Sequence, residues 1–205
     1  KLRRAATTDA ELSARLIVEE ATGIEPRLFP LEQDRPVSQG AVVRADAMTI
    51  RRAQGEPLQY VLGHWPFRYL DLAVDARALI PRPETEVVAG FVINLLQSLS
   101  RDDARKLIVS DMGTGSGAIA LSIAHEVLHA EIHATDVSKE ALSLARSNLA
   151  GLGRSAARVQ LYQGDWFHAL PDELCGTLDA LISNPPYVSP DYELPSAVAD
   201  WEPSD

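Results

Sequence analysis

Apolar residues recur every three or four positions near the start of the chain, which predicts an amphipathic helix. The residues of this stripe are Leu12, Leu16, Ile17 and Ala21. Thr8 and Glu11 have the spacing of a capping box, in which each side chain satisfies a backbone N–H group of the first turn. We therefore expect the helix to begin at Thr8 and to stop at Gly23.

The next segments predict a second helix and then a hairpin. The helix is expected after Pro36, with Ser38 as its N-cap and an end at Gly55. Its apolar face consists of Val42, Ala45 and Met48. Apolar and aromatic residues then follow closely over residues 58–80, with a break at Gly63, which indicates a short β-hairpin.

From residue 81 onward, short apolar runs alternate with helical patterns. A helix after Pro83 has an apolar stripe of Val87, Val88, Phe91, Val92, Leu95, Leu96 and Leu99. Strands are expected at 107–111, 131–135, 159–162 and 178–183, and further helices at 118–128 and 139–149. Short strands separated by such helices form βαβ units, so we predict an α/β fold with a parallel sheet.

The composition is that of a soluble globular protein, with 46 % hydrophobic and 23 % charged residues. The longest stretches without a charged residue have 14 positions, fewer than the roughly 18 to 20 that span a bilayer. The basic start is not followed by an apolar segment, which argues against a secretory signal. Cys175 is the single cysteine, so no internal disulfide can form, and we expect a cytoplasmic protein.

The net charge of −10 is unevenly distributed. Residues 1–78 carry 11 basic and 11 acidic side chains, whereas residues 79–205 carry 8 basic and 18 acidic ones. Phosphate backbones are bound mainly by Lys and Arg and are repelled by an acidic field. Nucleic acid is therefore not expected as a partner of the second part.

A glycine-rich loop follows the first predicted strand, where residues 111–118 are Asp-Met-Gly-Thr-Gly-Ser-Gly-Ala. Glycines allow a sharp turn and a close approach to a ligand, and the N–H groups of the helix start point toward it. The candidate cofactor-binding residues here are Gly113, Thr114, Gly115, Ser116 and Gly117. The same spacing fits a dinucleotide-binding loop, or a turn that only packs a helix on a strand.

Two further strand ends carry candidate ligand-binding residues. Asp136 could accept hydrogen bonds from ribose hydroxyls, or it could cap a helix beside Ser138. Asp165 could bind an adenine amino group, and Trp166 could stack on the purine, although aromatics after a strand are often core residues. Because the carboxyl ends of parallel strands share one edge, these residues together predict a nucleoside site.

The fourth strand is followed by Asn184, Pro185, Pro186 and Tyr187. The prolines remove two N–H donors and stiffen the turn. The Asn184 side-chain oxygen and the Pro185 carbonyl can then accept hydrogen bonds from a planar NH₂ group, and Tyr187 can cover its face. A turn that only leaves a strand needs neither the asparagine nor the tyrosine. We therefore assign Asn184, Pro185 and Tyr187 as candidate catalytic residues for chemistry on a planar nitrogen, which a hydride-transferring enzyme does not need.

The glycine loop, Asp136 and the Asn-Pro-Pro-Tyr turn resemble class I S-adenosylmethionine-dependent methyltransferases that act on planar nitrogen. Residues 55–63, Gly-Glu-Pro-Leu-Gln-Tyr-Val-Leu-Gly, and 79–86, Leu-Ile-Pro-Arg-Pro-Glu-Thr-Glu, are similar to the peptide chain release factor N5-glutamine methyltransferases. The resemblance implies methyl transfer from S-adenosylmethionine to a glutamine amide of a release factor, a step in protein methylation for translation termination. S-adenosylhomocysteine would be the product.

The resemblance also implies roles and an organisation. Gly113 to Gly117, Asp136, Trp166 and Asn184 would contact the cofactor, and Asn184 to Tyr187 would hold the substrate glutamine. Residues 1–57 would form a helical N-terminal domain that recognises the substrate, 58–80 a hairpin linker, and 81–205 the Rossmann-like methyltransferase domain. The class I sheet has seven strands in the order 3-2-1-4-5-7-6. Only four are found before Asn184, so the C-terminal strands are expected to be missing from this sequence.

Two other functions remain open at this point. A nucleic-acid amino methyltransferase would present adenine N6 or guanine N2 to the same turn. An inactive cofactor-binding module is the non-enzymatic alternative. No Cys/His set has metal-ligand spacing, so no metal is expected. None of the five histidines, nor Cys175, is identified as a general base. We expect a monomer with no membrane association.

Overall fold

The computed structural model describes residues 1–5, 7, 9–102, 105–185 and 200–203. The chain divides into two compact units. One comprises residues 1–63 together with Asp200 and Trp201, and the other begins at His64 and includes Glu202. None of the described helices is both long and apolar enough to cross a bilayer.

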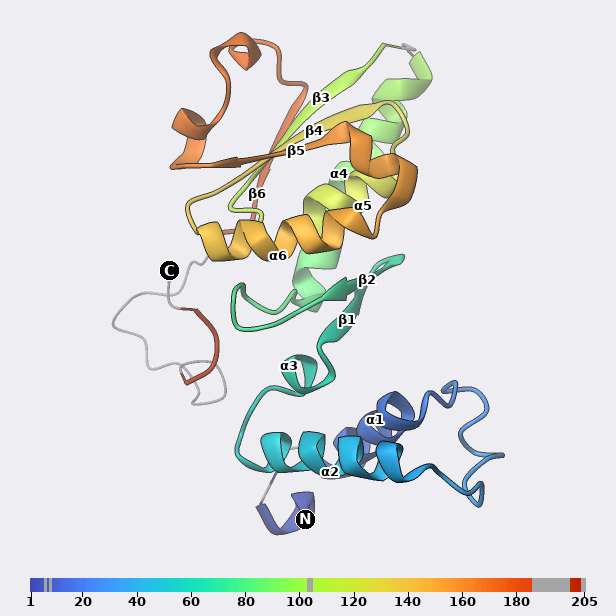
Figure 1. Ribbon diagram of the computed structural model, residues 1–205. Helices are drawn as coiled ribbons and strands as arrows, with labels where there is room; N and C mark the ends of the chain where they lie inside the picture. Colours follow the sequence, from blue (N-terminus) through green and yellow to red (C-terminus); the bar gives the residue numbers. More distant parts are fainter. Residues whose placement is uncertain (6, 8, 103–104, 186–199, 204–205) are drawn as a thin grey trace. The chain divides into compact units, whose positions relative to one another are not determined.

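The first unit is helical (Figure 1). Its elements are the 3₁₀ turn η1 (Leu2–Ala5) and the helices α1 (Ala10–Thr22), α2 (Gln39–Ala53) and α3 (Leu58–Leu62). Leu2, Ile17, Leu58 and Val61 form its core. Ser38 caps α2 as predicted, because its hydroxyl accepts a hydrogen bond from the Ala41 N–H at 3.2 Å. Residues 58–62, expected in the hairpin, instead form α3.

The start and the buried face of α1 differ from the prediction. The N-cap is Asp9, whose side chain makes no capping bond, and Thr8 lies outside the described residues. Glu11 forms an ion pair with Arg3. The buried row comprises Ser13, Ile17 and Ala21, so the predicted Leu12 is 53 % exposed. In α2, likewise, Ala45 and Met48 pack against the core, but Val42 is exposed.

The second unit begins with the antiparallel hairpin β1 (His64–Phe67) and β2 (Leu70–Ala73), which confirms the predicted hairpin over a shorter range. Arg68 occupies the turn with φ 53°. Its guanidinium donates two hydrogen bonds to the Glu126 carboxylate, at 2.6 and 2.7 Å, and both side chains are mostly buried. This bidentate ion pair ties the hairpin turn to the helix that ends at Glu126.

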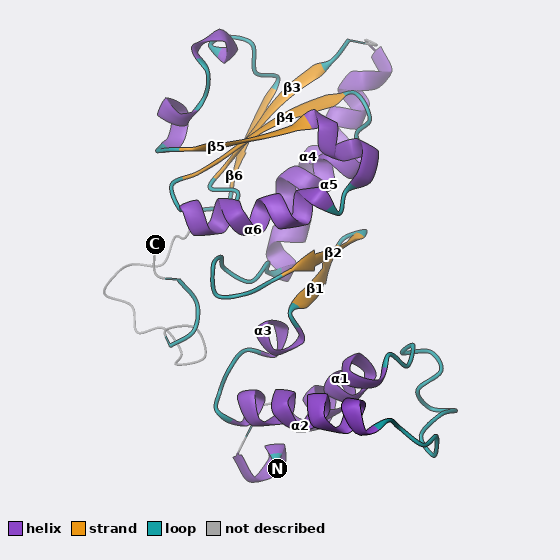
Figure 2. Cartoon of the chain, in the orientation of Figure 1, coloured by secondary structure: helices purple, strands orange, loops and turns teal. Residues whose placement is uncertain are grey.

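A four-stranded parallel sheet follows (Figure 2). Its strands are β3 (Leu107–Met112), β4 (Ala130–Asp136), β5 (Val159–Gln163) and β6 (Ala180–Ser183), in the order β5-β4-β3-β6. The intervening elements are α4 (Pro83–Asp102), α5 (Ala118–Glu126), α6 (Lys139–Ala150) and the 3₁₀ turns η2 (Gly153–Arg158), η3 (Trp166–Ala169) and η4 (Asp172–Leu174). This order equals the 3-2-1-4 half of the class I sheet, as predicted.

The core of this unit lies between the sheet, α4 and α5. The buried row of α4 comprises Ala89, Ile93 and Leu96, whereas Val87 and Phe91 of the predicted stripe are 73 % and 74 % exposed. The prediction was right for Leu96, which is fully buried, and for Val92, which packs against the core, but wrong for Val87 and Phe91. Because α4 is apolar around most of its circumference, periodicity alone does not select the buried face. The sheet and α5, against which this row packs, select it.

Candidate functional site

A cavity of about 470 Å³ lies at the carboxyl ends of the parallel strands. The sequence-predicted residues that line it are Gly113, Thr114, Gly115, Ser116, Asp136, Asp165, Trp166, Asn184 and Pro185. Gly117 is adjacent to them but does not line the cavity, and Pro186 and Tyr187 lie outside the described residues. Ligands in open parallel sheets bind at this edge, and pockets for small molecules have about this volume.

The glycine loop is anchored on the end of β4. The N–H groups of Gly113 and Thr114 both donate to the Thr135 carbonyl at 2.9 Å. Gly115 has φ 58°, and a Cβ atom there would meet nothing within 4 Å, so its backbone conformation and not crowding favours glycine. The loop therefore presents an open backbone surface to the cavity.

Asp136 ends β4 and fixes two neighbouring segments. Its Oδ2 accepts a hydrogen bond from the Gly115 N–H at 2.8 Å, and its Oδ1 accepts one from the Ser138 N–H at 2.9 Å. The alternative interpretation, that Asp136 caps the helix, was wrong, because the N-cap of α6 is Ser138 and Asp136 binds the N–H group of that residue. Each carboxylate oxygen accepts more than one hydrogen bond, so both can still receive a ligand hydroxyl.

Asp111 is a buried carboxyl beneath the loop that the sequence analysis did not single out. Its Oδ2 accepts hydrogen bonds from the Thr114 hydroxyl at 2.7 Å and from the Ala120 N–H at 3.1 Å. Burial raises the pKa of Asp111 to about 6, against the effect of these two donors, and the charge of Asp136 adds to the increase. Asp111 thus joins the loop to the first turn of α5.

We expect Asp111 to make the protein less stable as the pH rises from about 4 to about 6. The pKa is higher in the folded state than the ordinary value of 3.8, so the folded state retains the proton over this interval and loses stability when it ionises. A shift of about two units corresponds to roughly 3 kcal/mol. In Asp111→Asn, chemical denaturation at several pH values should show a free energy of unfolding that depends less steeply on pH than in the wild type. A pH dependence in Asp111→Asn that is as steep as that of the wild type would contradict this assignment.

Asp165 and Trp166 follow β5 and both line the cavity. Trp166 is 48 % exposed and has φ 44°, a left-handed conformation that is uncommon for an aromatic residue. Gly164 precedes them, and a Cβ atom there would lie 2.9 Å from the Ala169 Cβ. The close return of η3 onto Gly164 explains how the chain holds Trp166 at the rim of the cavity and outside the core.

Asn184 follows β6 and faces a residue of α4. Its Nδ2 donates a hydrogen bond to the Thr85 hydroxyl oxygen at 2.9 Å, and Thr85 is 8 % exposed. This bond holds the NH₂ group of the amide toward Thr85, so the Oδ1 atom is the acceptor that a ligand can use. Pro185 and Pro186 carry no backbone N–H group, so the turn has fewer donors of its own that could occupy its carbonyls.

The wall opposite the sheet comes from the segment between the hairpin and α4. Arg77, Ile80 and Arg82 line the cavity there. Glu202 fixes this wall: its buried carboxylate accepts hydrogen bonds from the Ile80 N–H at 3.1 Å and from the Arg82 guanidinium at 2.5 Å. The sequence analysis singled out the Pro-Arg-Pro-Glu-Thr-Glu segment but not these individual residues.

The described lining residues include no histidine, cysteine or lysine. His133, for example, lies in β4 with its Nδ1 atom 3.0 Å from the Tyr162 hydroxyl. Cys175 is exposed. Within the described part of the chain, no group of three or more His, Cys, Asp or Glu residues is placed to hold a metal ion.

Comparisons with known proteins match both units. A family model described as methyltransferase small domain matches residues 92–199, and one described as PrmC N-terminal domain matches residues 1–63. The release factor glutamine methyltransferase of Bifidobacterium longum is 38 % identical over 218 aligned positions, which cover 99 % of this chain and 71 % of that protein. Those of Moorella thermoacetica and Agrobacterium fabrum are 47 % and 35 % identical, and the matches cover 73 % and 93 % of this chain. The alignments span 50 % and 64 % of these two relatives.

Proposed function

Because the chain belongs to the family of release factor glutamine methyltransferases, we propose that it methylates the side-chain amide nitrogen of a glutamine in a peptide chain release factor. The observation that carries this proposal is the position of Asn184. It lines the same cavity as the glycine loop, with its NH₂ group bound to Thr85 and its oxygen available to a planar amide. We place the reaction in the cytoplasm, where translation termination takes place, and assign it to a monomer.

The residues of the cavity fit S-adenosylmethionine. Its volume of about 470 Å³ lies within the range of pockets for small molecules. Asp136 would accept hydrogen bonds from the ribose hydroxyls, Trp166 would cover the purine, and Asp165 would accept from the adenine amino group. The loop from Gly113 to Gly117 would approach the remainder of the molecule closely. S-adenosylhomocysteine would leave from the same site, and no metal is assigned.

The reaction requires help mainly at the nitrogen. S-adenosylmethionine supplies a methyl group on a positively charged sulfur, which needs no further activation. A glutamine amide is a poor nucleophile because its lone pair is delocalised into the carbonyl. Asn184 Oδ1 and the Pro185 carbonyl would accept hydrogen bonds from the two N–H groups of the amide. These bonds would orient the nitrogen and stabilise the positive charge that develops there. We also assign Pro186 and Tyr187 to substrate binding, with the tyrosine ring covering the amide plane.

We assign the departing amide proton to water. The described lining residues include no histidine, cysteine or lysine that could act as a base. Asn184 and Pro185 are acceptors that hold the protons without removing them. The proton would therefore leave after the N–C bond has formed, when the nitrogen is positively charged and acidic.

We assign different functions to the three segments of the chain. The helical residues 1–57 would recognise the release factor, residues 58–80 would connect the two domains, and residues 81–205 would carry out methyl transfer. The match of a separate family model to residues 1–63 supports a distinct N-terminal module. The compact unit likewise ends at Gly63.

A labelling experiment tests the proposed function. The protein is incubated with S-adenosylmethionine that carries a radioactive methyl group, with a release factor in one reaction and a DNA and RNA mixture in another. Label in the release factor alone supports the proposal, and mass spectrometry should locate it on a glutamine. Label in nucleic acid would replace it with the amino methyltransferase alternative. Cofactor binding without label in either would indicate an inactive binding module.

A further inference from the structure

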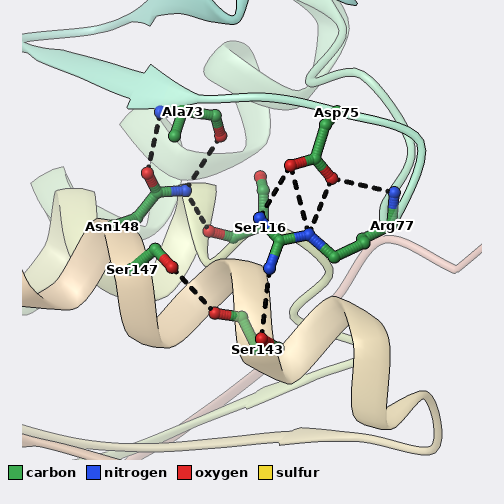
Figure 3. A network of polar contacts seen from close by, with 7 residues as sticks. All are labelled: Ala73, Asp75, Arg77, Ser116, Ser143, Ser147 and Asn148. Carbon is green, nitrogen blue, oxygen red and sulfur yellow. Dashed lines mark hydrogen bonds and ion pairs between the residues drawn. The ribbon is translucent and has the colours of Figure 1, made fainter.

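Asn148, near the end of α6, makes three hydrogen bonds to the backbone of two distant segments (Figure 3). Its Oδ1 accepts from the Ala73 N–H at 2.7 Å, and its Nδ2 donates to the Ala73 carbonyl at 3.1 Å and to the Ser116 carbonyl at 2.9 Å. An N–H group can only face the oxygen, and carbonyls can only face the NH₂ group, so the orientation of the amide is fixed.

These bonds join the hairpin to the glycine loop. Ala73 is the last residue of β2, and Ser116 belongs to the loop. The first half of the loop is held by β4, through Thr135 and Asp136. The Ser116 carbonyl, in the second half, is held by Asn148. The loop is therefore fixed at both ends, once by the sheet and once by a side chain of α6.

The same helix also holds the segment that follows the hairpin (Figure 3). Arg77 donates a hydrogen bond to the Ser143 hydroxyl at 3.1 Å, and its guanidinium is bound by both oxygens of Asp75, with a closest contact of 2.7 Å. Arg77 lines the cavity. Thus α6 positions the loop on one side of the cavity and the wall on the other, through side chains that do not themselves line it.

We propose that Asn148 is a positioning residue for the cofactor, which sets the affinity of the glycine loop by holding the Ser116 carbonyl against the end of the hairpin. Asn148 does not line the cavity, so it acts through Ser116 and touches no ligand. Without this bond, the Ser116 peptide loses one of its anchors, so that more of the loop has to be ordered when the cofactor binds, and part of the binding free energy is lost to that ordering. The inference rests on the proposed function only in taking this loop as the cofactor site.

The experiment measures cofactor binding without a release factor. Isothermal titration calorimetry with S-adenosylmethionine and with S-adenosylhomocysteine should give Kd values about tenfold higher for Asn148→Ala than for the wild type. Asn148→Asp has the same shape and keeps the acceptor for Ala73, but it turns a carboxylate oxygen toward two carbonyls. We expect it to bind at least as weakly as the alanine variant.

Ser147→Ala is the matched control, because Ser147 is the adjacent residue and its hydroxyl donates only to the Ser143 carbonyl, at 3.1 Å. Its Kd should equal that of the wild type. Hydrogen exchange without cofactor gives a second readout: the amides of residues 113–120 should exchange faster in Asn148→Ala and unchanged in Ser147→Ala.

A purely structural role predicts a different result. Asn148→Ala and Asn148→Asp would then melt at a lower temperature, yet bind both compounds within twofold of the wild type at a temperature where all are folded, with unchanged exchange in the loop. That result overturns the inference and leaves the proposed function intact. If the alanine variant does not fold, the isosteric aspartate variant decides by the same criteria. A wild-type protein that binds neither compound would refute the proposed function itself.

Discussion

Replacing Asn184 by alanine is expected to abolish methyl transfer while leaving S-adenosylmethionine binding largely intact. The substitution removes the side-chain oxygen that would accept a hydrogen bond from the substrate amide, and with it half of the pair that orients the nitrogen. Loss of one preorganised hydrogen-bonding group of this kind costs on the order of 100- to 1000-fold in turnover. Single-turnover methylation with the release factor and titration with the cofactor measure the two effects separately.

The control for Asn184→Ala is Leu181→Ala, a substitution in the same strand. Leu181 lies in β6 and is 45 % exposed, and it does not line the cavity. Its turnover should remain close to that of the wild type. Near-normal turnover of Asn184→Ala would remove the assignment of Asn184 as a catalytic residue, whatever the substrate proves to be.

Thr85→Val is expected to lower kcat about ten- to hundredfold, with little change in the Kd of the cofactor. Valine has the shape of threonine but no hydroxyl, so the Asn184 NH₂ group loses its acceptor in a place where Thr85 is only 8 % exposed. An unsatisfied donor costs about 1 to 3 kcal/mol, and the amide can escape this cost by turning its NH₂ group toward the cavity. A donor would then face the substrate amide where an acceptor is needed.

The rate of Thr85→Ser separates this effect from a loss of packing. Serine retains the hydroxyl and lacks only the methyl group, so most of the wild-type kcat should return. Steady-state kinetics with varied release factor and cofactor give kcat and both KM values for the three proteins. Equal rates in the valine variant and the wild type would show that Thr85 does not orient Asn184, and an equal loss in the serine variant would show that the methyl group is what matters.

Local features of the fold were predictable because they depend on short stretches of sequence. The alternation of apolar runs and helical patterns indicated the four parallel strands to within about two residues at each end. Ser38 and Ser138 act as caps because a hydroxyl before a helix meets the third residue after it. The glycine loop and the residues Asp136, Trp166 and Asn184 were recognisable because strand ends converge at one edge of a parallel sheet.

The faces of the helices were less predictable. In α1, Leu12 fits the periodic pattern but is exposed, because the row that meets α2 and α3 begins at Ser13. In α4, two apolar rows compete, and the sequence contains no local signal for which of them packs on the sheet. Hydrophobic periodicity reports that a helix has an apolar face, but the shape of the partner decides how far the helix is rotated.

What the sequence by itself determined about this protein is which residues are candidates for the site: the glycine loop, proposed to bind a nucleoside cofactor, and the Asn-Pro-Pro-Tyr turn, proposed to bind a planar nitrogen. The tertiary structure alone decided how these groups are held. Asn184 meets Thr85 across 99 positions of the chain, and Asn148 meets Ser116 across 32. Such pairs leave no periodic pattern and no fixed spacing, because the residues become neighbours only when the sheet forms and the helices pack on it. The candidate catalytic residues could therefore be recognised in the sequence, whereas the residues proposed to orient them could be found only in the folded structure.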